Sequence, residues 1–205
     1  MSNDAIADID VGALIAALAR EGAVSLPLIG ETTRRRLLAA ARERPYRRAR
    51  DQIGEGDRRV RQDMELRDRF EDGDPFHRLA ARLGAAIERG ARRLVPYPFA
   101  TPFRFDDLML QRYRPGSLGI TPHRDGLRYL NLICLITLAG SVRFAVCDDR
   151  AGANPRPLDV APGRAIFMIA PGFGGGEARP FHFVDQVTSE RVGLGLRQKR
   201  TAAST

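Results

Sequence analysis

The chain has 205 residues, of which 43% are hydrophobic, a length that suits one domain with a substantial core and is short for two. No stretch approaches the roughly 20 consecutive apolar residues of a membrane helix, and the acidic start "MSNDAIADID" is unlike a secretion signal. We therefore expect a cytoplasmic protein without a membrane partner. The two cysteines, Cys134 and Cys147, lie in apolar, strand-like stretches and are expected to be buried, reduced thiols.

The formal charge of +8 suggests nucleic-acid binding, but the distribution of charge favours another explanation. Between Arg34 and Arg61 there are 11 arginines and four acidic residues, whereas residues 63–74 hold six acidic residues and two arginines. Neighbouring segments of opposite charge partly neutralise each other at a surface. We favour this solvated surface over a phosphate-binding one, which stays the alternative.

The chain begins with elements of helical and strand character. Residues 10–22, "DVGALIAALAREG", place apolar residues at helical spacing between an aspartate and a glycine, and predict a short amphipathic helix. Residues 23–29 predict a strand. Residues 31–44 predict a second helix, which Pro45 ends.

A loop and a third helix are expected next. Residues 46–62 have weak periodicity and several arginines, and predict an exposed loop or lid. Residues 74–95 predict a helix with Asp74 as its cap and Pro75 in its first turn.

From about residue 103, strand-length segments alternate with Gly, Pro and Asp. Such short strands at this spacing predict a sandwich or barrel, so the fold class expected is mainly β with flanking helices. We expect one domain over residues 1–198, with 1–100 mostly helical and 101–198 forming the β core, and a polar tail over 199–205. The predicted strands are 107–113, 130–138, 141–148, 157–161, 164–170, 180–184 and 191–198.

The segment "TPHRDG", residues 121–126, places a histidine and an aspartate two positions apart. If it begins or borders a strand, His123 and Asp125 point to the same face. An isolated pair of this kind is usually a turn histidine beside a surface aspartate. A metal site needs a third ligand.

Two other histidines could supply that ligand. His77 lies in the predicted third helix, where a packing or surface role is expected. His182 lies between Phe181 and Phe183, so in a strand it points away from both rings and needs a polar partner. Two histidines and one carboxylate form the facial triad of non-haem iron(II) oxygenases.

The last predicted strand carries an unusual polar face. In "RVGLGLRQ", Arg191 and Arg197 share one face with Gly193 and Gly195, whereas Val192, Leu194 and Leu196 form the opposite, packing face. Two cations separated by residues without side chains leave room for an anion. A buried arginine without a carboxylate is costly, so a small anionic ligand explains this face best.

These segments resemble the iron(II) and 2-oxoglutarate-dependent oxygenases, and within them AlkB-like proteins most. The resemblance covers roughly residues 105–198 and rests on "QRYRPGSLGITPHRD", on His182 in "PFHFV" and on "RVGLGLR". It implies a double-stranded β-helix, a jelly-roll, cupin-like core. AlkB-like proteins carry Asn where Gln111 stands, and Asn and Thr in place of the two glycines of the last strand.

The resemblance also implies roles for individual residues. His123, Asp125 and His182 would be the iron ligands and the catalytic centre. The cosubstrate 2-oxoglutarate would be held by a set of cofactor-binding residues, with Arg191 on its distal carboxylate. That set is Arg191, Arg197, Tyr113 and Gln111.

The resulting hypothesis is a dioxygenase that uses Fe(II), 2-oxoglutarate and O2 to hydroxylate or oxidatively demethylate a small molecule or metabolite, with release of succinate and CO2. An AlkB-like nucleic-acid demethylase is second, because the arginine-rich segment holds only Tyr46 as an aromatic platform. A non-catalytic, cupin-like metal-binding module is third. Substrate contacts are expected from residues 46–74 and from the glycine-rich segment 172–180, which could be a mobile loop or a plain turn.

Overall fold

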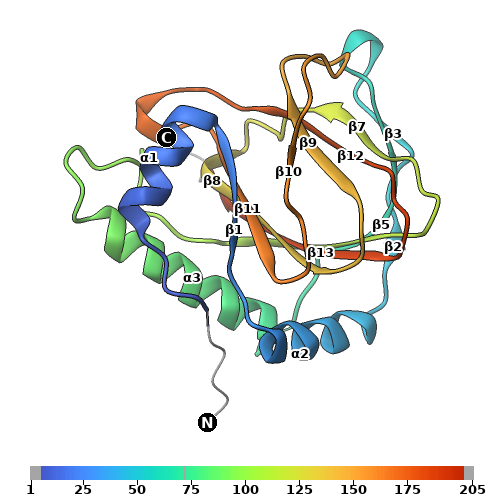
Figure 1. Ribbon diagram of the computed structural model, residues 1–205, viewed down its shortest axis with the longest axis horizontal. Coiled ribbons are helices and arrows are strands. Elements are labelled where there is room, and N and C mark those ends of the chain that lie inside the picture. Colours follow the sequence, from blue (N-terminus) through green and yellow to red (C-terminus); the bar gives the residue numbers. More distant parts are fainter. Residues whose placement is uncertain (1–5, 72, 201–205) are drawn as a thin grey trace, which may run out of the picture.

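The computed structural model describes residues 6–71 and 73–200, and two antiparallel sheets dominate it. The strand order is β1-β11-β8-β13-β6-β5-β2 in the seven-stranded sheet and β10-β9-β12-β7-β4-β3 in the six-stranded sheet. Consecutive strands of the C-terminal half fall mostly in different sheets, as in a jelly roll. The two sheets with flanking helices are shown in Figure 1.

The seven-stranded sheet is built around two long neighbouring strands, β8 and β13. Both contain aliphatic residues that suit a sheet covered on both faces. From one edge to the other, its strands are β1 (Ala23–Pro27), β11 (Arg164–Ile169), β8 (Tyr129–Ala139), β13 (Arg191–Lys199), β6 (Asp107–Tyr113), β5 (Glu65–Arg67) and β2 (Arg47–Arg48).

The six-stranded sheet faces it with shorter strands, each bounded by turn residues. Glycine is required at one of these turns, because Gly119 has a φ of 79° and a Cβ there would lie 1.9 Å from the Val184 carbonyl oxygen. Its strands are β10 (Arg156–Leu158), β9 (Arg143–Cys147), β12 (Phe181–Asp185), β7 (Gly119–His123), β4 (Val60–Asp63) and β3 (Gln52–Ile53).

Three helices cover the outer face of the seven-stranded sheet (Figure 1). They are α1 (Val11–Glu21), α2 (Glu31–Arg42) and α3 (Pro75–Ala91), close to the predicted spans. Asp10 caps α1 as its oxygen accepts from the Ala13 amide at 2.9 Å. Asp74 occupies the N-cap position of α3, but its carboxylate bonds to Arg44 and the Glu71 amide instead of the helix.

The core forms two layers because the side chains of β8 alternate. Leu132, Cys134, Ile136 and Leu138 pack against the helices, whereas Ile133 and Leu135 point between the two sheets. The mainly β, jelly-roll fold class with flanking helices is therefore confirmed. The space between the sheets is where the polar face of β13 lies.

Two sequence-based expectations need correction. Residues 46–62 are mostly exposed, as expected, but they are not an irregular loop throughout: they contain β2, β3 and part of β4, which extend both sheets through pairings too short to show periodicity. The polar tail begins later than expected, since β13 continues to Lys199, and positions 201–205 lie outside the described residues.

The remaining general expectations concern the thiols and the membrane. Both cysteines are free; Cys134 is buried, but Cys147 is only half-buried because it ends β9. Among the described helices, none has the length and apolar character needed to span a bilayer.

Candidate metal and anion site

His123 and His182 lie directly opposite each other on the paired strands β7 and β12. Their ring centroids are 4.3 Å apart, and Asp125 follows just after β7 ends. Ligand atoms of the three side chains all lie within 4.8 Å of one another. The structure therefore brings together the three residues that the sequence singles out, from segments almost 60 positions apart.

Each imidazole is oriented by a backbone carbonyl. His123 Nδ1 lies 2.9 Å from the Thr121 carbonyl oxygen, and His182 Nδ1 lies 3.2 Å from that of Pro180. With the proton on Nδ1, each Nε2 keeps a lone pair for a cation, and the two Nε2 atoms lie 3.7 and 3.8 Å from Asp125 Oδ1. Metal-binding histidines are commonly fixed in this way.

The charge states in the site suit a divalent cation. Burial, reinforced by His182, lowers the pKa of His123 to about 4, and burial also lowers the pKa of His182. Burial alone would raise the pKa of Asp125, but the charge of Arg197 and its hydrogen bond hold that pKa below its usual range. Two neutral imidazoles and one carboxylate are the donor set that binds first-row transition metals.

Arg197 reaches this carboxylate from β13. Its Nε donates to Asp125 Oδ2 at 3.1 Å, and its guanidinium lies 5.1 Å from the centre of the Tyr129 ring. Only Oδ1 of Asp125 faces the two histidines. Arg197 thus orients the carboxylate so that one oxygen points into the site.

Arg191 is the most deeply buried of the four arginines that line the cavity. It is 2% exposed, its Nε has no hydrogen-bond partner, and among the described residues no carboxylate lies within ion-pair distance. Burial lowers its pKa, which the neighbouring Tyr113 phenol partly offsets. Its Cζ lies 5.5 Å from the Tyr113 ring centre. A buried arginine in this position needs an anion.

The glycines of β13 make room for the arginines themselves. A Cβ at Gly193 would lie 3.6 Å from Arg191 Cζ, and one at Gly195 would lie 2.7 Å from Arg197 Nη1. Each guanidinium therefore leans over its neighbouring glycine, toward the middle of the strand. The two cations are drawn closer than the roughly 20 Å that six residues of strand would separate them.

A cavity of about 280 Å³ joins these groups. The three clustered residues and both arginines line it, together with Tyr113 and Gln111 on β6. Gln111 Nε2 lies 3.6 Å from Met64 Sδ, so its amide group is held at the wall. Apolar side chains close the rest, mainly Ile120, Leu135, Phe144 and Val184.

Sequence reasoning missed several neighbours of the site. Phe144 stacks on His182 at 5.6 Å between ring centres, and Arg179 Nη1 donates to the Asp125 carbonyl oxygen at 2.7 Å. No local motif marks either residue: Phe144 is brought in by the pairing of β9 with β12, and Arg179 lies in the segment just before β12. His77 is exposed and contacts only the Phe70 ring among aromatic groups of the described chain, in agreement with a surface role.

The two expected substrate-contact segments differ in position. Ile53, Gln62 and Met64 from the first line the cavity. None of residues 172–180, all of which are described, lines that cavity, but Arg179 and Pro180 line a small hollow beside Asp125 and His182. In the second segment, Gly174 donates its amide hydrogen to the Pro98 carbonyl at 2.8 Å.

The arginine-rich and acid-rich segments pair with each other as expected. Arg47 bonds to Asp68 at 2.5 Å and Arg44 to Asp74 at 2.6 Å. Arg48 lies 3.7 Å from Asp63. Part of the positive charge is thereby neutralised within the protein.

Comparison with known proteins gives a structural likeness only. No family model and no curated protein matches the sequence. A prolyl hydroxylase from Trichoplax adhaerens, solved with a hypoxia-inducible-factor peptide fragment, matches at TM-score 0.70 and 13% identity over 92% of this chain and 88% of that one.

Two further solved structures agree. A 2OG-Fe(II) oxygenase family protein from Burkholderia pseudomallei matches at TM-score 0.65 and 18% identity, covering 93% of this chain and 91% of its own. OsALKBH1 matches at TM-score 0.58 and 14% identity, over 86% and 98%. The resemblance seen in the sequence is thus confirmed at the level of the fold: this chain has the double-stranded β-helix fold of the iron(II) and 2-oxoglutarate-dependent oxygenases, AlkB-like proteins included.

Proposed function

We propose that the protein is an Fe(II)/2-oxoglutarate-dependent dioxygenase that hydroxylates or oxidatively demethylates a small-molecule substrate, with release of succinate and CO2. One observation carries the proposal: a two-histidine, one-carboxylate cluster shares a cavity with the buried, unpaired Arg191. The first group fits a metal and the second fits a carboxylate. Together they match the two requirements of this chemistry.

The roles follow from the contacts of each side chain. His123 and His182 would hold the iron through Nε2, and Asp125 through Oδ1. Arg191 would bind the distal carboxylate of 2-oxoglutarate, and Tyr113, opposite it in register, would donate its phenolic hydrogen to the same group. Gln111 would lie along the bound cosubstrate. Arg197 would keep Asp125 ionised and oriented.

The surroundings suit a reaction that must exclude water. Phe144 stacks on His182, and Ile120 and Leu135 also line the cavity, so charges beside these apolar side chains interact more strongly than in water. Bound iron with 2-oxoglutarate and O2 would supply the oxidation of a substrate C–H bond. The protein's part is to position the substrate carbon near the cluster and to keep both imidazoles neutral.

The contacts of the tyrosine rings near the cavity favour a small-molecule substrate over a nucleic acid. A tyrosine ring can stack with a base only if at least one of its faces is open. The guanidinium of Arg112 lies 4.4 Å from the Tyr46 ring centre. The guanidinium groups of Arg128 and Arg197 lie 4.8 and 5.1 Å from the ring centre of Tyr129. Guanidinium groups thus already contact both rings, which leaves less ring surface for a stacked base.

The alternatives keep some support. The fold likeness to OsALKBH1 and the exposed arginines between 34 and 61 favour a nucleic-acid demethylase as the second candidate. A cupin-like module that only binds metal would account for the triad, but it leaves the unpaired Arg191 without a purpose.

Oxygen-dependent turnover of 2-oxoglutarate tests the proposal. The purified protein with Fe(II) should convert 2-oxoglutarate to succinate slowly without substrate and faster with one. His182→Ala should abolish both rates. If the unaltered protein forms succinate no faster than His182→Ala does, the oxygenase assignment is refuted.

A further inference from the structure

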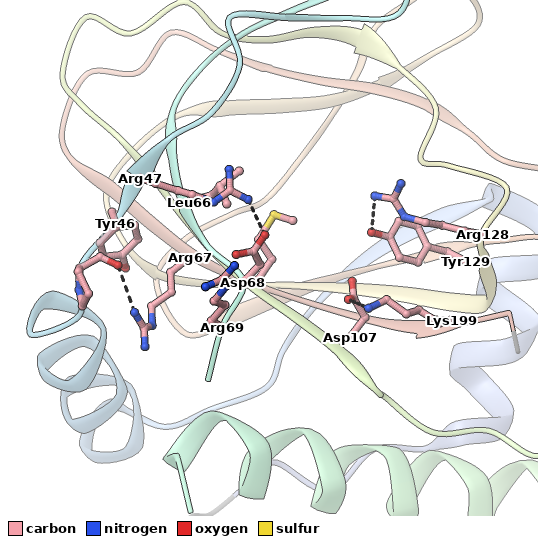
Figure 2. A pocket seen from close by; sticks show the side chains of 12 residues that line it. Tyr46, Arg47, Leu66, Arg67, Asp68, Arg69, Asp107, Arg128, Tyr129 and Lys199 are labelled. Atoms are coloured by element: carbon pink, nitrogen blue, oxygen red, sulfur yellow. Dashed lines mark hydrogen bonds and ion pairs between the residues drawn. The ribbon is translucent and has the colours of Figure 1, made fainter. Parts of the chain in front are cut away.

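A second, larger hollow of about 790 Å³ adjoins the cavity, and we call it the outer groove. Figure 2 shows its side chains, with Tyr46, Arg67, Asp68 and Arg69 on one side and Arg128, Tyr129 and Lys199 on the other. The groove and the cavity share Met109, Arg128 and Tyr129. A ligand in the groove would therefore lie beside the entrance to the metal cluster.

One face of strand β6 connects the two spaces. Tyr113, Gln111, Met109 and Asp107 are alternate residues of this strand, and they lie on the same face of the sheet as the β13 residues opposite them, from Arg191 to Arg197. Tyr113 and Gln111 line the cavity, Met109 lines both spaces and Asp107 lines the groove. An elongated molecule could thus lie along β6 with one end near the cluster.

The charges of the outer groove are unbalanced. Five cations line it, Arg47, Arg67, Arg69, Arg128 and Lys199, against the carboxylates of Asp68 and Asp107. Asp68 is paired with Arg47 at 2.5 Å, and Asp107 with Lys199 at 2.5 Å. Three arginines remain.

Those three arginines have no acidic partner within the described part of the chain. Arg67 bonds only weakly to the Pro45 carbonyl, at 3.4 Å, and its buried Nε has no hydrogen-bond partner. Arg128 donates to the neutral hydroxyl of Tyr129 at 3.0 Å. Arg69 is exposed beside them. Their planar donors suit a carboxylate or a phosphate.

We propose that the outer groove binds the anionic end of the substrate, a small organic acid or phosphate ester, through Arg67, Arg69 and Arg128. This inference rests on the proposed oxygenase function for the reaction at the other end of the molecule. Stacking of a nucleobase is disfavoured at its two tyrosine rings, because guanidinium groups already lie 4.4 Å from the ring centre of Tyr46 and 4.8 and 5.1 Å from that of Tyr129. A small anion is the occupant that the three arginines without acidic partners favour.

Calorimetric titration of metal-free protein, at low ionic strength and without 2-oxoglutarate, tests the groove alone. The probes are tricarballylate for a carboxylate and inorganic pyrophosphate for a phosphate, and at least one should bind saturably. Arg67→Gln/Arg69→Gln should weaken that binding at least tenfold. Arg20→Gln, an exposed arginine of α1 that makes no ion pair within the described chain, should change it less than twofold.

A variant that is expected to strengthen probe binding serves as a control for a purely structural effect. Asp68→Asn frees Arg47 and should tighten probe binding. Arg191→Gln should retain it, because Arg191 belongs to the inner cavity. Absence of saturable binding, unchanged binding in the double variant, or loss in Arg191→Gln alone would each overturn the assignment.

A single-stranded oligonucleotide is the third probe. Binding tighter than that of either small anion, and weakened by the same double variant, would overturn the small-anion assignment in favour of a nucleic acid. Failure here is distinguishable from failure of the oxygenase proposal. The titration needs neither iron nor turnover, and succinate formation does not need the groove.

Discussion

Arg197 and Asp125 are joined by a hydrogen bond of 3.1 Å from Nε to Oδ2, although 72 residues separate them. This contact ties the last strand to the carboxylate of the metal cluster. The other oxygen, Oδ1, is left to face both imidazoles. Arg197 therefore acts through Asp125, whereas Arg191 has no acidic partner among the described residues and can bind an anion.

Metal stoichiometry tests the cluster. The purified protein should bind one Fe(II) per chain, and His123→Ala, Asp125→Ala and His182→Ala should each largely abolish binding, since a facial triad has no spare ligand. His77→Ala is the matched control and should keep full binding, because that histidine is exposed on α3. Elemental analysis decides the matter, and full iron retention in His182→Ala would remove the triad from consideration.

Arg191 and Arg197 should respond differently to the same substitution. Arg191→Gln should keep iron but raise the 2-oxoglutarate concentration for half-maximal succinate formation by orders of magnitude, since a lost buried charge contact costs roughly 2 to 5 kcal/mol. Arg197→Gln should raise it less and should instead weaken iron binding. An unchanged half-saturation in Arg191→Gln would mean that the anion lies elsewhere.

The two glycines of β13 provide a matched pair of tests. Gly195→Ala places a methyl group 2.7 Å from Arg197 Nη1, so the guanidinium must move and its bond to Asp125 weakens. Iron affinity should fall by about tenfold, as for other residues that orient metal ligands. Gly193→Ala meets nothing closer than 3.6 Å and should change iron affinity less than twofold. Equal effects in an iron titration would contradict this role for Arg197.

The sequence predicted what is periodic. The alternation in "RVGLGLRQ" correctly placed Val192 and Leu194 toward the helices and the arginines between the sheets, because a regular strand has only two faces. The spacing of His123 and Asp125 and the position of His182 between two phenylalanines, together with the arginine face of the last strand and the family resemblance, selected the residues that cluster. Asn131 shows the limit: its φ of 61° at the start of β8 has no signal in a strand-like segment.

What depends on distant pairing could not be predicted. The strands at 47–48 and 52–53 have two residues each and exist only through their partners β5 and β4. Phe144 stacks on His182 because β9 pairs with β12, which no local pattern encodes. The bond of Arg197 to Asp125 is of the same kind.

Substrate class can be tested by stimulation of turnover. We expect metabolites that carry a carboxylate or phosphate to stimulate succinate release, and their neutral amides or unphosphorylated forms to do so less. Oligonucleotides should bind weakly and give no stimulation whether methylated or not, because the arginines near residues 44–48 are partly paired. Formaldehyde release with a methylated oligonucleotide would promote the demethylase hypothesis to first place.

The thiols should differ in reactivity. Burial raises the pKa of Cys134 strongly and that of Cys147 as well, but only Cys147 is partly accessible. A thiol-specific disulfide reagent should therefore modify one cysteine per native chain slowly and two after unfolding. Cys147→Ser should remove the native reaction. Rapid modification of both thiols in the native protein would contradict the burial of Cys134.

The central claim is that the cluster and Arg191 hold iron and 2-oxoglutarate side by side, and anaerobic absorption spectroscopy tests it most directly. Adding Fe(II) and then 2-oxoglutarate to the protein without oxygen should produce the visible charge-transfer band of the keto-acid chelate. The band should require far more 2-oxoglutarate in Arg191→Gln and should be absent in His182→Ala. A protein that binds iron but gives no band at any 2-oxoglutarate concentration would contradict the account.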